Sequence, residues 1–114
     1  MSFRNLIGIS MYVIMTRVKL KPETHETCAR IFQKANPGLV ENEPDWLGAR
    51  MVFDAETNVV TVMATWRSAA SYKRLAASSE FQKTMQKFAE LFASPPEISI
   101  NSLLVEMEPQ RRSD

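Results

Sequence analysis

Residues 59–81 read VVTVMATWRSAASYKRLAASSEF, and this stretch does most to decide the fold. Its first part is rich in β-branched and apolar side chains, which is typical of a strand, and it ends on Trp66. Ser68 then follows as a residue type that caps helices, and Ser78 or Ser79 can cap a second helix. The stretch predicts a strand, a short helix and a longer helix, and we expect function to lie at the strand-to-helix junction.

The residues before this stretch predict the other half of a hairpin. Residues 46–53 alternate along the chain, with an apolar set made of Leu47, Ala49, Met51 and Phe53. Residues 54–58 supply turn formers, and a connection of that length joins neighbouring antiparallel strands. Residues 46–53 and 59–66 are therefore expected to pair.

Two more strands and one more helix are expected outside the hairpin. Residues 11–20 are apolar on both faces of a strand, and residues 98–107 carry enough apolar content for a last strand. Pro22 suits the first turn of a helix, and Asn36-Pro37-Gly38 is expected to end that helix.

The element order is therefore β-α-β-β-α-β, an α+β, ferredoxin-like arrangement in which two helices cover one face of a four-stranded antiparallel sheet. The first and third strands are apolar on both sides, so the second face of the sheet needs a partner. Symmetric pairing of two sheets meets that need, and we expect a homodimer.

The composition is that of an ordinary globular domain. The chain has 114 residues, of which 45% are hydrophobic and 24% charged, enough for one core. A net charge of +1 gives no excess of positive charge that would attract nucleic acid or an anionic membrane. No apolar run is long enough to span a membrane. Cys28 is the lone cysteine, which excludes an internal disulfide and fits a reducing compartment. We expect a cytoplasmic protein with no nucleic-acid or membrane partner.

Four short motifs, in order along the chain, resemble those of a known family. They are Lys21-Pro22-Glu23 after the first strand, Pro44-Asp45-Trp46-Leu47-Gly48-Ala49 opening the second, Trp66-Arg67-Ser68 closing the third, and Ser78-x-x-Phe81. Together they resemble the antibiotic biosynthesis monooxygenase family of dimeric α/β barrels. The resemblance covers about residues 10–107, which implies one such domain between an extension at 1–9 and a polar tail at 108–114.

The resemblance implies a cofactor-independent monooxygenase acting on a small planar phenolic or quinol-type compound. Some family members resemble enzymes in which a polycyclic phenol or quinol itself supplies electrons to oxygen inside a water-poor cavity. Such enzymes place an Asn four residues before the strand-three Trp and a Tyr six residues after it, and here those positions are Val62, Trp66 and Tyr72. Losing the Asn removes an amide donor and an acceptor.

The expected substrate-binding residues are Trp66, Tyr72, Thr16 and Val62. Trp66 is expected to stack on the ligand, while Tyr72 and Thr16 donate hydrogen bonds. No residue is assigned a catalytic role. Trp66 can equally fill the core at a strand end, and Tyr72 can be a half-buried helix residue with its hydroxyl in water.

A second branch of the family resembles haem-degrading enzymes, and this chain departs from it. The Asn, Trp and His of that branch fall on Thr16, Leu75 and Met85. The only histidine, His25, is expected near the start of the first helix, away from a cavity. Neither haem, a metal nor another cofactor is expected.

The apolar residues Val62, Leu75 and Met85 also favour an alternative function. The chain can be a non-catalytic dimeric barrel that binds a small apolar ligand. A cavity with polar groups beside Trp66 would favour the enzyme, whereas side chains filling that space would favour the binding module. The sequence identifies neither the substrate nor the pathway.

Overall fold

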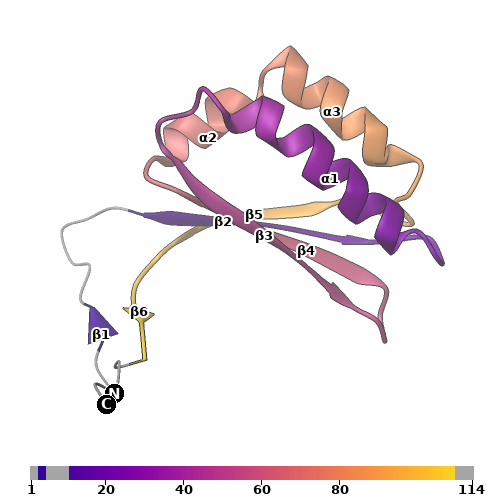
Figure 1. Ribbon diagram of the computed structural model, residues 1–114, viewed down its shortest axis with the longest axis horizontal. Coiled ribbons are helices and arrows are strands. Elements are labelled where there is room, and N and C mark those ends of the chain that lie inside the picture. The colour runs from indigo at the N-terminus through magenta and orange to yellow at the C-terminus, as the bar shows by residue number, and fades with distance from the viewer. Residues whose placement is uncertain (1–2, 5–10, 110–114) are drawn as a thin grey trace.

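The computed structural model describes residues 3–4 and 11–109. Its elements are β1 (Phe3–Arg4), β2 (Tyr12–Lys19), α1 (His25–Val40), β3 (Trp46–Asp54), β4 (Val59–Trp66), α2 (Ala69–Ala76), α3 (Ser79–Ala89), β5 (Glu97–Ser102) and β6 (Glu106–Met107) (Figure 1). The predicted β-α-β-β-α-β order is confirmed for β2 to β5, with α2 and α3 together forming the second helical segment.

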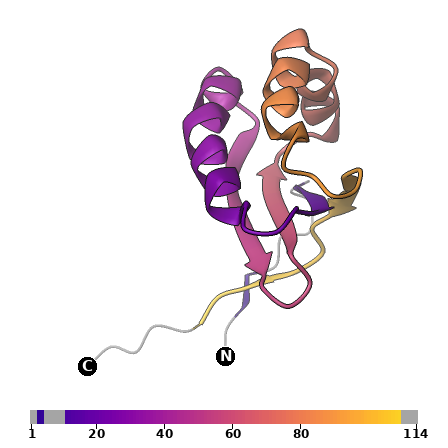
Figure 2. The same cartoon turned by 90° about the vertical axis from the view of Figure 1, so that its right-hand side faces the viewer.

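One antiparallel sheet holds β2 to β5 in the order β3-β4-β2-β5. On the central strand β2, Thr16 pairs with Val62 of β4 on one side and Ile98 of β5 on the other. Paired residues share a face of the sheet. All three helices lie over one face, with α1 and α3 side by side (Figures 1 and 2). The predicted α+β, ferredoxin-like fold is confirmed.

The first helix begins later and runs further than the sequence predicted. Thr24 is its N-cap residue, and the helix continues through Pro37, where a break was expected. Pro37 lacks the N–H for a helical hydrogen bond, which normally kinks or ends a helix. Its carbonyl still accepts a hydrogen bond from the Glu41 N–H at 3.0 Å. Burial of Val40 in the last turn supports the extension, so tertiary packing outweighs the local signal.

Serine residues start the other two helices, as predicted. Ser68 Oγ accepts a hydrogen bond from the Ser71 N–H at 3.1 Å, and Ser78 Oγ accepts one from the Phe81 N–H at 3.2 Å. Each bond satisfies a backbone donor that has no partner within the first helical turn. Of the two residues offered for the second cap, the structure selects Ser78, and Ser79 is the first helical residue.

A bulge at the start of β3 breaks the expected alternation. Trp46 pairs with Trp66, but Gly48 pairs with the adjacent Thr65, so Leu47 is an extra residue. Gly48 has a φ of 143°, a conformation that side-chain-bearing residues rarely adopt. Trp46 consequently packs on the helix side, and Leu47 is 37% exposed. Leu47 therefore does not share a face with Ala49, Met51 and Phe53, with which simple alternation grouped it.

The chain after β5 also departs from the prediction of one strand over 98–107. Ser102 pairs with Tyr12, the first residue of β2, so no further partner residue lies beyond it in that strand. The chain leaves the sheet, and β6 pairs with β1 in a separate two-stranded ladder (Figure 1). Much of the predicted extension at 1–9 and tail at 108–114 lies outside the described residues.

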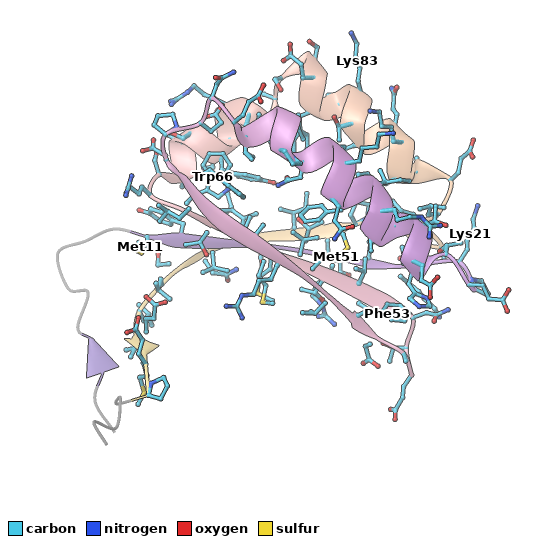
Figure 3. The ribbon with its side chains drawn as sticks, viewed as in Figure 1. Met11, Lys21, Met51, Phe53, Trp66 and Lys83 are labelled. Carbon is cyan, nitrogen blue, oxygen red and sulfur yellow. The ribbon has the colours of Figure 1, made fainter. Side chains whose placement is uncertain are left out.

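The core lies between the helices and the sheet in two buried clusters. One gathers around Leu20, Cys28 and Phe88, and the other consists of Ile14, Trp66 and Tyr72. Figure 3 shows Trp66 beneath α2, on the same side of the sheet as the helices. Within the described residues, no helix is both long and apolar enough to cross a membrane.

Candidate functional site

A cavity of about 120 Å³ lies between the helices and the sheet. Strands β2, β3 and β4 line one side, and residues of all three helices line the other. The four residues expected to bind substrate all border it: Thr16, Val62, Trp66 and Tyr72. They meet because Thr16 pairs with Val62, Trp66 lies four residues further along the same face of β4, and Tyr72 follows in the next helix. That a substrate contacts them stays a prediction.

Aromatic rings form one end of this cavity. The Trp66 and Tyr72 rings meet edge to face, with centroids 5.9 Å apart and planes at 68°. Trp66 is only 2% exposed, and Trp46 packs against the same cluster. Sequence reasoning missed Trp46 as a wall residue because simple alternation points it away from the helices. Gly48 was the available signal, since glycine within a strand often marks a bulge.

The Tyr72 hydroxyl has no hydrogen-bond partner among the residues that the structure describes. Burial raises the pKa of Tyr72, and no hydrogen bond contributes to the shift. None of the described residues has a buried side-chain N or O atom without a partner, so this unpaired oxygen keeps accessible surface. At neutral pH the phenol is therefore protonated and can donate to a ligand.

The rest of the lining is almost entirely apolar. Val62, Leu75 and Met85 all border the cavity. Among the lining residues that the structure describes, there is no Asp, Glu, His, Lys or Arg. Cys28 also lies in the wall, but burial raises the pKa of its thiol and disfavours the thiolate. The cavity therefore provides no group that readily takes a proton at neutral pH.

Two further polar wall residues, Asn36 and Thr84, were missed from the sequence. Asn36 was interpreted as part of a helix break, yet it lies within α1. Thr84 follows Phe81 by three residues and precedes Phe88 by four, which places it on the inward stripe of α3. Helical spacing alone was enough to find Thr84.

A hydrogen-bonded cluster behind the cavity fixes its aromatic end. Ser71 Oγ donates to Asp45 Oδ2 at 2.6 Å, and Arg74 Nη2 donates to Ser71 Oγ at 3.1 Å. The Arg67 N–H donates to the Asp45 carbonyl at 2.8 Å. Ser71 is only 3% exposed, so this polar contact is protected from water. Asp45, Arg67 and Ser71 are the sequence neighbours of the three aromatic wall residues, Trp46, Trp66 and Tyr72.

His25 lies outside the cavity, as expected. It is exposed at the start of α1 and stacks on Phe53, with ring centroids 4.5 Å apart. In the part of the chain that the structure describes, no group of three His, Cys, Asp or Glu side chains is arranged to hold a metal ion. That the protein needs neither metal nor haem stays a prediction.

Comparison with known families matches most of this domain. The model of the family described as antibiotic biosynthesis monooxygenase matches residues 11–87. The chain belongs to the antibiotic biosynthesis monooxygenase family. The resemblance found through the four motifs is thereby confirmed. Among curated proteins, none matches this family member.

Solved structures share the fold of this monooxygenase-family chain. A candidate antibiotic biosynthesis monooxygenase from Bordetella bronchiseptica has a TM-score of 0.72 at 18% identity, covering 81% of this chain and 95% of its own. Another from Nitrosomonas europaea has a TM-score of 0.71 at 13% identity, with 91% and 96% covered. A protein from Shewanella oneidensis has a TM-score of 0.70 at 13% identity, with 92% and 100% covered. At such identities the likeness shows the fold alone.

Proposed function

We propose that this chain is a cofactor-independent monooxygenase that oxidises a small planar phenol or quinol held between the helices and the sheet. The observation that carries the proposal is the aromatic end of the cavity. Trp46 and Trp66 offer flat apolar surfaces there, and Tyr72 offers an unpaired, protonated hydroxyl. Membership of the family supports oxygenation as the reaction.

The chemistry requires no external reductant. A phenol and one molecule of dioxygen give a quinone and one molecule of water. One oxygen atom enters the ring, and the other leaves as water with the hydrogens of the phenolic O–H and the replaced ring C–H. All the electrons that dioxygen accepts come from the ring. The protein's part is to orient the ring and to exclude bulk water with an apolar wall.

Oxygen consumption by the full chain tests this proposal. A panel of electron-rich phenols and hydroquinones is incubated with the protein while an electrode records dioxygen. We expect one dioxygen consumed per quinone formed, and loss of most of the rate in Trp66→Ala. Lys83→Ala, an exposed change on α3, is the control and should keep the rate. A panel in which compounds bind but consume no oxygen above the buffer rate would contradict the proposal.

That last result would favour the second candidate function, a module that binds a small apolar ligand without turnover. The observation in its favour is the apolar character of Val62, Leu75 and Met85 in the cavity wall. Without an amide at position 62, the cavity has fewer groups to polarise dioxygen or a phenolate.

We also propose that two copies pair through the open faces of their sheets. Met15 pairs with Met63 on that face, and Val52 on the same face is 47% exposed. Beyond the sheet, Leu104 is 80% exposed. Apolar surface of this kind usually needs cover, and a symmetric partner provides it.

Sedimentation at micromolar concentration tests the pairing. We expect the mass of a dimer for the unmodified chain and that of a monomer for Met63→Lys, since the new charge would be buried in the interface. A monomer for the unmodified chain, or a dimer interface below ~1,000 Å² in total, would contradict the proposal.

A further inference from the structure

Resting on the proposed function, we propose that the cavity is selective for a neutral, single-ring phenol or hydroquinone. The size of the cavity rejects rings with a second fused ring, and the uncharged wall rejects rings that carry a carboxylate. The two exclusions rest on different observations, and each has its own probe compound.

The size of the cavity limits the ligand to one ring. Its volume is about 120 Å³. An engineered apolar cavity of ~150 Å³ binds benzene, which sets the scale for a single aromatic ring. The wall is made of buried core residues such as Ile14 and Phe88, which are packed against both sheet and helices. The cavity is partly open to the surface, so a second fused ring would either displace these side chains, which interiors resist, or leave its apolar carbon atoms in water.

The wall also limits the charge of the ligand. None of its described residues is Asp, Glu, His, Lys or Arg, so a ligand carboxylate would find no ionic partner there. Two arginines that follow the aromatic wall residues in the sequence do not border the cavity, and each donates a hydrogen bond outside it: Arg74 donates to Ser71, and Arg67 Nη1 donates to the Pro44 carbonyl at 3.3 Å. Burying an unpaired carboxylate costs far more than burying a phenol that can donate or accept hydrogen bonds.

The few polar wall residues suit one or two ligand hydroxyls. Tyr72 supplies a free donor at the aromatic end. Thr16 on β2 and Thr84 on α3 supply hydroxyls from opposite sides of the cavity. A ring with one or two hydroxyls can therefore pair its polar atoms while its carbon skeleton stays in apolar surroundings.

Calorimetric titrations of the full chain under nitrogen test the selectivity, because the absence of oxygen separates binding from turnover. The probes are phenol, hydroquinone, 1-naphthol and 4-hydroxybenzoate. We expect phenol and hydroquinone to bind, and the other two to bind at least about tenfold more weakly, a factor that corresponds to 1.4 kcal/mol.

Variants of one wall residue test the size limit directly. Leu75 borders the cavity, whereas Leu91 packs in the core without bordering it. Leu75→Ala should therefore bring 1-naphthol to within a few-fold of phenol, and Leu91→Ala, the same deletion outside the wall, should not. Met85→Ala opens the wall from α3 and gives the same test if Leu75→Ala does not fold.

The outcomes separate this inference from the proposed function. Tighter binding of 1-naphthol than phenol by the unmodified chain would overturn the size limit, and equal binding of 4-hydroxybenzoate would overturn the charge limit. Selective binding of single rings without oxygen uptake in air would support the inference and refute the oxygenase. Oxidation of fused-ring phenols alone would refute the inference and support the oxygenase. Binding of none of the probes would overturn the inference.

Discussion

Replacing Tyr72 by Phe removes one hydroxyl and leaves the ring in place. In the protein that hydroxyl has no hydrogen-bond partner among the described residues, and burial alone raises the pKa of Tyr72. The edge-to-face contact with Trp66 at 5.9 Å does not depend on it. No bond to a described residue is lost, so the free energy of unfolding should change by less than about 0.5 kcal/mol.

Ligand binding should respond differently to the same change. If the hydroxyl donates to a bound phenol, its loss should weaken binding by ~0.5–1.5 kcal/mol, or roughly 2- to 13-fold in Kd. Urea denaturation measures the first quantity, and calorimetric titration with hydroquinone under nitrogen measures the second. The matched control is Tyr12→Phe, because Tyr12 packs against the same cluster without bordering the cavity. It should leave the Kd unchanged.

Two results would refute this reasoning. A loss of more than about 1.5 kcal/mol of stability in Tyr72→Phe would mean that the hydroxyl holds the fold together. An unchanged Kd for a ligand that the unmodified chain binds would mean that the hydroxyl faces away from the ligand. The second result would remove Tyr72 from the ligand-binding groups and weaken the case for an oxygenase.

Three further changes have defined outcomes. Ser71→Ala deletes the 2.6 Å bond to the Asp45 carboxylate and should lower the free energy of unfolding, measured by urea denaturation, by about 1.5–3 kcal/mol. An unchanged denaturation midpoint would show that the bond does not contribute to stability. Gly48→Ala meets no atom within 4 Å of the new Cβ, but the φ of 143° should still cost about 1–3 kcal/mol. Burial raises the pKa of Cys28 from 9.0, so its contribution to the free energy of unfolding is full below pH 9 and is lost as pH rises through the raised pKa. In Cys28→Ala the free energy of unfolding should fall less steeply with pH above pH 9 than in the unmodified chain. Equal slopes in the two proteins would contradict the role given to Cys28.

The fold was largely predictable because its signals are local. The turn formers at 54–58 lie beside two β-rich segments, and the caps at Ser68 and Ser78 each need only their own first turn. Such features depend on residues within a few positions of one another. The end of α1 was not predictable in this way. Pro37 is a strong local signal for a break, but the helix continues to Val40, which is buried and borders the cavity, and that burial depends on residues far away in the sequence.

The part of the candidate site that follows from residue spacing was predictable. Thr16, Val62, Trp66 and Tyr72 border one cavity because strand alternation and the short β4-to-α2 connection bring them together. The Ser71–Asp45 bond was not predictable, since it joins residues 26 positions apart and depends on how α2 lies against the start of β3. The cavity itself is a property of packing, and the sequence gives no measure of its volume.

The extra residue at the start of β3 has a consequence for anyone aligning related chains. Every residue after Gly48 keeps the face that regular pairing gives it, so an insertion at Leu47 changes nothing downstream in the sheet. A relative that lacks this residue can present the same inward tryptophan with regular pairing and no need for glycine. An alignment that permits no gap at Leu47 would then match Trp46 to a loop residue of that relative. The relative would wrongly be judged to lack the tryptophan of the aromatic wall. Superposing the hairpins, with Trp66 as the fixed point, avoids that error.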